Sequence, residues 1–177
     1  MTNYNFLSQL GFKLVIHRLE AIEYLVQKVN LPGLNLGFAT RFTPFAQDPR
    51  SGDLTFNDFQ ISFKVDKELK SYLSVWNWMT ALGFPQNFGQ YKELMEKNPL
   101  FANFEEGEIT SDITLMVLDN KHIPIFKCVF ISCFPIALSD LQLNSTDTDV
   151  MYLTADATFK YTYYTINPYP GSCNTSN

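Results

Sequence analysis

The fold is decided by the stretch Phe59-Gln60-Ile61-Ser62-Phe63-Lys64-Val65, in which apolar and polar residues strictly alternate. This alternation predicts a β-strand with one buried face and one face in solvent. Upstream, Leu54 and Phe56 lie in the opposite phase, so a bulge or tight bend is expected at Asn57-Asp58. We therefore expect residues 54–65 to form a strand with one local irregularity.

A helix is expected directly after this strand, over residues 66–82. Asp66 is a favourable N-cap residue, and Gly83 followed by Pro85 is a strong stop signal. The apolar residues between them recur at helical spacing and form one stripe: Leu69, Tyr72, Leu73, Trp76 and Met79. This pattern assigns Trp76 to the core, whereas Trp78 lies off the stripe and is expected to be partly exposed or at an interface.

Three further strands are indicated after the helix. Apolar residues alternate over Ile113–Val117, and Ile125–Phe134 is apolar on both faces, which predicts a central strand covered on both sides. Val150–Tyr164 alternates without a break and is expected to form one long strand. Together these segments predict a mainly β fold with one packed α-helix, arranged as an antiparallel β-sandwich or as part of a barrel.

The chain length of 177 residues fits a single domain. We expect residues 1–11 to form an N-terminal segment, residues 12–166 the β domain, and residues 167–177 a flexible tail. Residues 34–45 are expected to be extended, and a loop is expected at residues 46–53, because these contain the Asp, Pro, Ser and Gly that are typical of loops.

The composition is rich in aromatic residues and poor in charge. There are 16 Phe, 9 Tyr and 2 Trp, whereas charged residues make up 18% of the chain and the net charge is -5. The negative charge disfavours a basic protein that binds nucleic acid in a groove. The most apolar stretch, Ile123–Leu138, includes Lys127 and two prolines and is too short for a transmembrane helix, so no membrane segment is expected. An aromatic surface with little charge favours self-association.

The sequence shows no pattern typical of catalysis, so the chain is predicted not to be an enzyme and to need no cofactor or metal. His17 and His122 have no Cys, His or carboxylate neighbours at metal-ligand spacing. Neither a phosphate-binding glycine loop nor a nucleophile elbow is present. Glu105, Glu106 and Glu108 are interpreted as a solvated acidic loop, because neighbours on a loop lack the fixed separation of a catalytic carboxylate pair.

The order of these features resembles the tail tube proteins of T-even-type contractile phages, including the baseplate tail tube initiator. The resemblance covers residues 12–165 and rests on Phe12–Ile16, Val26–Gly33, Ser51–Lys64, Tyr72–Met79, Phe130–Leu143 and the last strand. It implies a structural protein of the virion tail that forms hexameric rings, in which β-hairpins of each subunit build a continuous inner barrel. It also implies a long loop at residues 38–53 that touches the next ring. It leaves open a repeating tube subunit, an initiator or another ring at the end of the tube.

The resemblance also implies partners. These would be further copies of the chain in a homohexamer and neighbouring tail tube, sheath or baseplate hub proteins, while DNA passes through the lumen without specific binding. Residues on loops or on outer strand faces are the expected contacts between subunits or rings: Phe38, Arg41, Phe42, Phe45, Asp53, Tyr152 and Tyr164. The alternative hypothesis is a monomeric β-sandwich module that binds carbohydrate or protein, with Trp78 and the tyrosines of the last strand as its binding surface.

Overall fold

The computed structural model describes residues 11–19, 22–23, 25–42, 47–83, 89, 110–119, 121–143 and 152–169. The one helix assigned within these residues is α1, which spans Lys70–Gly83. The strands are β1 (Phe12–Ile16), β2 (Val26–Val29), β3 (Leu34–Phe42), β4 (Gln47–Phe56), β5 (Phe59–Lys64), β6 (Ser111–Leu118), β7 (Pro124–Leu138), β8 (Thr154–Lys160) and β9 (Tyr163–Pro168). No helix in this described part of the chain is both long and apolar enough to span a membrane.

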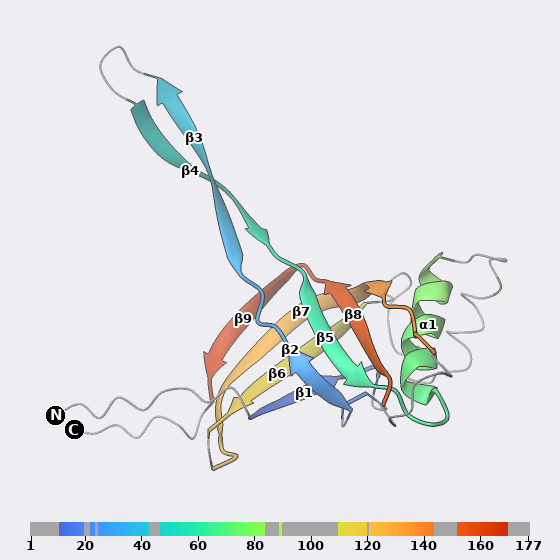
Figure 1. The fold of residues 1–177 in the computed structure, drawn as a ribbon. Coiled ribbons are helices and arrows are strands. Elements are labelled where there is room, and N and C mark those ends of the chain that lie inside the picture. The colour runs from blue at the N-terminus through green and yellow to red at the C-terminus, as the bar shows by residue number, and fades with distance from the viewer. Residues whose placement is uncertain are drawn as a thin grey trace.

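Two antiparallel sheets share strand β7 (Figure 1). Sheet A has the order β1-β6-β7-β9, and sheet B has the order β7-β8-β5-β2. Residues 126–131 of β7 pair with β9, whereas residues 134–138 pair with β8. Between these two parts Ser132 has a φ of 54°, and β7 passes there from one sheet into the other. The predicted mainly β fold with one helix is confirmed, and the monomer is not a closed barrel.

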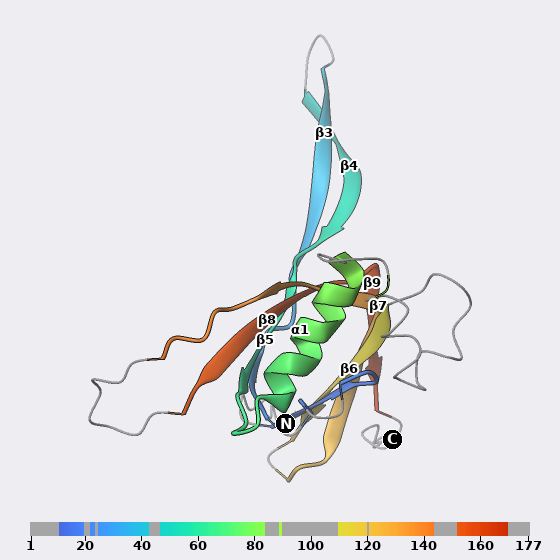
Figure 2. The same cartoon turned by 90° about the vertical axis from the view of Figure 1, so that its right-hand side faces the viewer.

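Aromatic rings build the core between the two sheets. Phe59 and Phe63 of β5, Phe130 of β7 and Phe159 of β8 are all fully buried. The ring centroids of Phe59 and Phe130 lie 4.4 Å apart, and the ring centroid of Trp78 lies 6.1 Å from that of Phe159. Trp78 belongs to α1, which covers one end of the sandwich between the strands of the two sheets (Figure 2).

The buried face of α1 differs from the predicted one. Trp78 is 2% exposed and Trp76 is 47% exposed, so the predicted roles of the two tryptophans were wrong. Ser71, Val75 and Ala81 are buried together with Trp78. Because these three side chains are small, the helix backbone can approach the sheets closely while one large ring fills the remaining space. Of the stripe that the hydrophobic pattern favoured, Leu69, Leu73 and Trp76 are exposed. Tyr72 and Met79 are half-buried and pack against the core.

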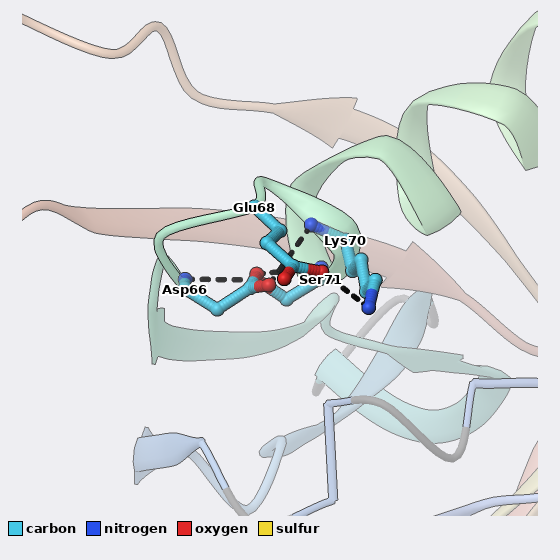
Figure 3. Close-up of polar contacts among 4 residues, drawn as sticks. All are labelled: Asp66, Glu68, Lys70 and Ser71. Carbon is cyan, nitrogen blue, oxygen red and sulfur yellow. Dashed lines mark hydrogen bonds and ion pairs between the residues drawn. The ribbon is translucent and has the colours of Figure 1, made fainter.

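Asp66 caps α1 through a turn that precedes the first helical residue (Figure 3). Its carboxylate accepts hydrogen bonds from the backbone N–H groups of Ser71 at 2.9 Å and Lys70 at 3.1 Å, and from the Ser71 hydroxyl at 2.6 Å. These bonds, above all those from Ser71, lower the pKa of Asp66 to about 2. Leu69 has a φ of 57°, which turns the chain into the helix, so α1 begins at Lys70 rather than at the predicted residue 66.

The long strand predicted at residues 150–164 was wrong, because the chain breaks at Tyr161-Thr162 into β8 and β9. At this break the Thr162 N–H donates to the Ile131 carbonyl of β7 at 3.0 Å, and the alternation changes phase. As a result Tyr164, and not Tyr163, packs against the core. β9 then continues to Pro168, past the predicted start of the tail at residue 167.

Strand β7 is central, as predicted, but the described residues bury only one of its faces. Cys128, Phe130 and Cys133 are buried, whereas Val129 and Ile131, on the other face, are half-buried. The prediction of a doubly covered strand was therefore wrong: within the described residues, this face of sheet A has no second layer.

Candidate functional site

Strands β3 and β4 form a hairpin that projects away from both sheets (Figures 1 and 2). Its register runs from Leu34 opposite Phe56 at the base to Phe42 opposite Gln47 towards the tip. Almost every residue of β4 is exposed. An isolated two-stranded hairpin is at best marginally stable in water, so an extended hairpin of this kind needs further packing.

Most of the loop predicted at residues 38–53 is strand in the structure. β4 begins at Gln47, and Pro49 pairs with Thr40 of β3. Proline is tolerated in a strand whose outer edge is free. The loop-like composition of residues 46–53 was misleading, because cross-strand pairing with the apolar and β-branched residues of β3 outweighs it.

One face of the hairpin is apolar and the other is polar. The apolar face, called here the hairpin face, consists of Leu34, Leu36, Phe38 and Leu54. These side chains are between 50% and 77% exposed, and Leu36 lies opposite Leu54 in the register. On the opposite face Arg41 pairs in register with Asp48, whose carboxylate lies 3.3 Å from Nε of Arg50. An exposed apolar surface of this kind is a candidate interaction site.

A β-bulge divides the hairpin at Gly37 and Gly52, where the register shifts. A Cβ atom on Gly52 would lie 3.1 Å from the carbonyl carbon and oxygen of Gly37, so a side chain there would be in unusually tight contact with the opposite backbone. Bulges increase the local twist of a strand pair. The two glycines therefore allow the hairpin to twist between its base and its tip, and Asp53 lies at this point.

Five of the predicted contact residues belong to the hairpin or its tip. Phe38 is the most exposed residue of the hairpin face, at 77%. Arg41 and Asp53 are exposed on β3 and β4, and Phe42 lies in β3. Phe45 lies outside the described residues, as do the glutamates of the predicted acidic loop. The structure thus brings Phe38, Arg41 and Asp53 together on one projecting element.

The other two predicted contact residues lie on the body. Tyr152 is 75% exposed, and Nζ of Lys64 lies 5.1 Å from the centre of its ring. Tyr164 is half-buried, and its hydroxyl donates to the Pro32 carbonyl at 3.0 Å. Tyr164 therefore supports the base of the hairpin, and its predicted position on an outer strand face was wrong.

Sequence reasoning missed a second exposed apolar surface on the outside of α1. Leu69, Leu73 and Trp76 are between 41% and 47% exposed and follow one another at helical spacing. The prediction had placed them in the core. The small residues Ser71 and Ala81 were the signal that another face of the helix lies against the sheets.

The described residues offer no arrangement suited to catalysis or metal binding. Among them, no three His, Cys, Asp or Glu side chains lie close enough to share a metal ion. His17 and His122 are both exposed. Burial raises the pKa of Cys128, and it raises that of Cys133 to about 12, so neither buried thiol is a reactive thiolate at neutral pH.

Solved structures share this fold at low sequence identity. A chain of the anti-feeding prophage baseplate matches with a TM-score of 0.64 and 9% identity, over 93% of this chain and 97% of that chain. The tube-terminating cap of the anti-feeding prophage matches with a TM-score of 0.61 and 10% identity, over 96% and 95% of the two chains. A chain from the sheath/tube terminator of an extracellular contractile injection system, in its extended state, matches with a TM-score of 0.59 and 10% identity, over 94% and 99%.

Sequence comparison gives the family. The tail tube terminator protein of Enterobacteria phage T4 is 26% identical over 152 residues, which cover 79% of this chain and 75% of that protein. A family model described as phage tail tube protein matches residues 3–167, nearly the whole chain. The chain therefore belongs to the phage tail tube protein family, whose members are structural components of the virion tail.

Proposed function

We propose that this protein forms a hexameric ring that ends the tube of a contractile phage tail. The similarity to the T4 tube terminator supports an end ring rather than a repeating tube subunit. The fold shared with a tube-terminating cap and with a sheath/tube terminator is consistent with this position. The proposal that the chain forms a ring rests on the strand arrangement of sheet A.

Sheet A has unpaired edges on both sides. Within the described residues, no strand pairs with the outer edge of β1 or with the outer edge of β9. Unprotected edges are templates for pairing with another chain. β1 and β7 run in one direction, and β6 and β9 run in the other. The number of strands in sheet A is even, so its two edge strands, β1 and β9, run in opposite directions. When a neighbouring copy is related by rotation, its β1 lies antiparallel to β9 of the first copy, and the copies can pair edge to edge into one closed barrel.

The hairpin face supplies contacts beyond the sheet edges. We propose that it packs on another copy or on a neighbouring tube protein, with Phe38, Arg41, Phe42, Phe45 and Asp53 as contact residues. Tyr152, exposed on the body, is proposed as a further contact. Sheath or baseplate proteins would then lie on the remaining outer surface of the ring.

The proposed ring is a conduit for DNA at infection and has no enzymatic role. A chain with a net charge of -5 repels phosphate in general, which favours passage over retention. The alternative, a carbohydrate-binding module that uses Trp78, loses its main support because Trp78 is 2% exposed and cannot stack on a sugar.

Ring formation is tested by electron microscopy of the purified chain, alone and with its neighbouring tail proteins, together with mass measurement in solution. Six-fold rings are expected. Tyr169 N–H donates to the Ile125 carbonyl of β7, so by alternation the Ile166 N–H points away from β7. Ile166→Pro removes this outward donor and should abolish rings while the monomer stays folded. Ile166→Val, which keeps the donor, should form rings normally. Particles of another symmetry, or rings unaffected by Ile166→Pro, would contradict the proposal.

A further inference from the structure

The hairpin joins the body at two chain crossings that lie side by side. Residues 30–33 link β2 to β3, and residues 57–58 link β4 back to β5. The Asn57 N–H donates to the Gly33 carbonyl at 3.1 Å, and the Asn35 side-chain amide donates to Oδ1 of Asn57 at 2.8 Å. The crossings are therefore bonded to each other, but these bonds alone do not fix the direction of the hairpin relative to the sheets.

Two tyrosines of the body each bind one of these crossings. The Tyr161 hydroxyl donates to the Asn57 carbonyl at 2.8 Å, and the Tyr164 hydroxyl donates to the Pro32 carbonyl at 3.0 Å. The ring of Phe56, the last residue of β4, packs edge-on against both tyrosine rings, at centroid distances of 5.9 Å and 5.8 Å. Each strand of the hairpin is thus anchored separately, and an aromatic ring fills the space between the anchors.

The body holds both tyrosine rings in turn. The ring of the fully buried Phe130 lies 5.1 Å from that of Tyr161 and 5.3 Å from that of Tyr164. Burial raises the pKa of Tyr161 to about 12, so its hydroxyl stays protonated and remains a donor at any physiological pH. The two anchors are therefore packed directly on the aromatic core.

The break between β8 and β9 makes this arrangement possible. In an unbroken strand, Tyr161 and Tyr164 would point to opposite faces, because they are separated by an odd number of positions. The break at Thr162 changes the phase and brings both rings to the same side. It is matched in β7, where the Ser132 N–H donates to the Asp112 carboxylate at 3.1 Å and φ is positive. Thr162, between β8 and β9, and Ser132 in β7 are thus both irregular positions, and both lie close to the two tyrosines that anchor the hairpin.

From this geometry we propose that Tyr161 and Tyr164 are positioning residues that fix the direction of the β3–β4 hairpin. A hairpin held in one direction presents the hairpin face already oriented, so less conformational entropy is lost when a neighbouring molecule binds. The consequence for binding rests on the proposed function, whereas the consequence for direction concerns the monomer alone.

The direction is measured as a distance distribution between spin labels in the monomer. The labels are placed at exposed positions, Ser51→Cys on β4 and Asn77→Cys on α1, in a Cys173→Ser background. Tyr161→Phe with Tyr164→Phe keeps both rings and removes both hydroxyls. We expect the distribution to broaden at least about twofold, because two anchoring hydrogen bonds are lost. Tyr163→Phe with Tyr152→Phe, which changes two exposed tyrosines, is the matched control and should leave the distribution unchanged.

An unchanged distribution in the double Phe variant would overturn the proposal. If that variant does not fold, each single variant is measured instead, and each should broaden the distribution because each lacks one anchor. Ring assembly is measured separately and should weaken roughly three- to tenfold per lost anchor. Failure of the wild-type chain to form rings would contradict the proposed function and leave the monomer measurement valid.

Discussion

The two-sheet body and the β3–β4 hairpin carry similar apolar side chains in opposite environments. In the body Phe59, Phe130 and Phe159 are fully buried within one chain. In the hairpin Phe38 is 77% exposed and Leu36 is 59% exposed, although both lie in a regular strand. The body therefore buries a core within one chain, whereas the apolar side chains of the hairpin face remain exposed in the monomer.

This difference separates folding from assembly. Substitutions in the body should change the free energy of unfolding, and substitutions in the hairpin face should change association without changing the fold. Substitutions at the base of the hairpin should affect both folding and assembly, because Phe56 contacts tyrosines that also pack on the core. The first two of the following predictions each compare a buried position with an exposed one.

The largest effect is expected for Phe130→Ala in the body. Phe130 is fully buried and contacts the rings of Phe59, Tyr161 and Tyr164. Its truncation leaves a cavity and should lower the free energy of unfolding by about 3–5 kcal/mol. Phe38→Ala removes the same side chain from the hairpin face and should change monomer stability by less than about 0.5 kcal/mol. Chemical denaturation of both variants checks this, and equal losses would refute the division between body and hairpin.

The two tryptophans of α1 should give the next largest difference. Trp78→Ala removes a ring that packs 6.1 Å from Phe159 and should cost about 3 kcal/mol or more. Trp76→Ala, two residues earlier and 47% exposed, should cost roughly 1 kcal/mol or less. Thermal or chemical unfolding measures both. If Trp76→Ala lowered the free energy of unfolding more than Trp78→Ala, the result would support the helix orientation that the hydrophobic stripe predicted.

The fold class could be predicted from the sequence because strict alternation and a capped helix are local signals. The stretch around Phe59 to Lys64 forms β5 with the predicted face buried. The orientation of α1 could not be predicted, because it depends on how closely small residues such as Ser71 let the helix approach the sheets. The break at Thr162 could not be predicted either, because it depends on a hydrogen bond to Ile131, a residue distant in the sequence.

The candidate site was predicted in part. Phe38, Arg41 and Asp53 were expected to be contact residues because the family resemblance makes this segment a loop that touches the next ring. All three lie on the projecting hairpin, and their contact role stays a prediction. The strand pairing of residues 47–53 was missed, because the local sequence is dominated by residue types typical of turns and the pairing depends on β3. The role of Tyr164 at the hairpin base depends on the phase change in the last strand, which no local pattern indicates.

On the hairpin face, Leu36→Ser with Phe38→Ser should weaken assembly while leaving the monomer intact. Both side chains are exposed, so the unfolding transition should not shift, whereas the apolar area lost from an interface should weaken association by about 1–3 kcal/mol. Analytical ultracentrifugation over a concentration series measures the association. Thr55→Ser on the polar face is the control and should assemble like the wild type. Assembly unaffected by the double variant would show that the hairpin face is not a contact.

The smallest effect is expected at the start of α1, where the half-buried Asp66 caps a helix that also packs on the core. The pKa of Asp66 is about 2 in the folded protein, below its ordinary value of 3.8. Because the folded-state pKa is lowered, the contribution of Asp66 to stability is present above about pH 4 and is lost as the pH falls towards 2. Asp66→Asn should therefore reduce the dependence of the unfolding temperature on pH between 4 and 2. Glu68→Gln, which removes only the exposed ion pair with Lys70, should keep that dependence. Identical pH profiles for the wild type and Asp66→Asn would show that the bonds to Ser71 do not stabilise the folded state.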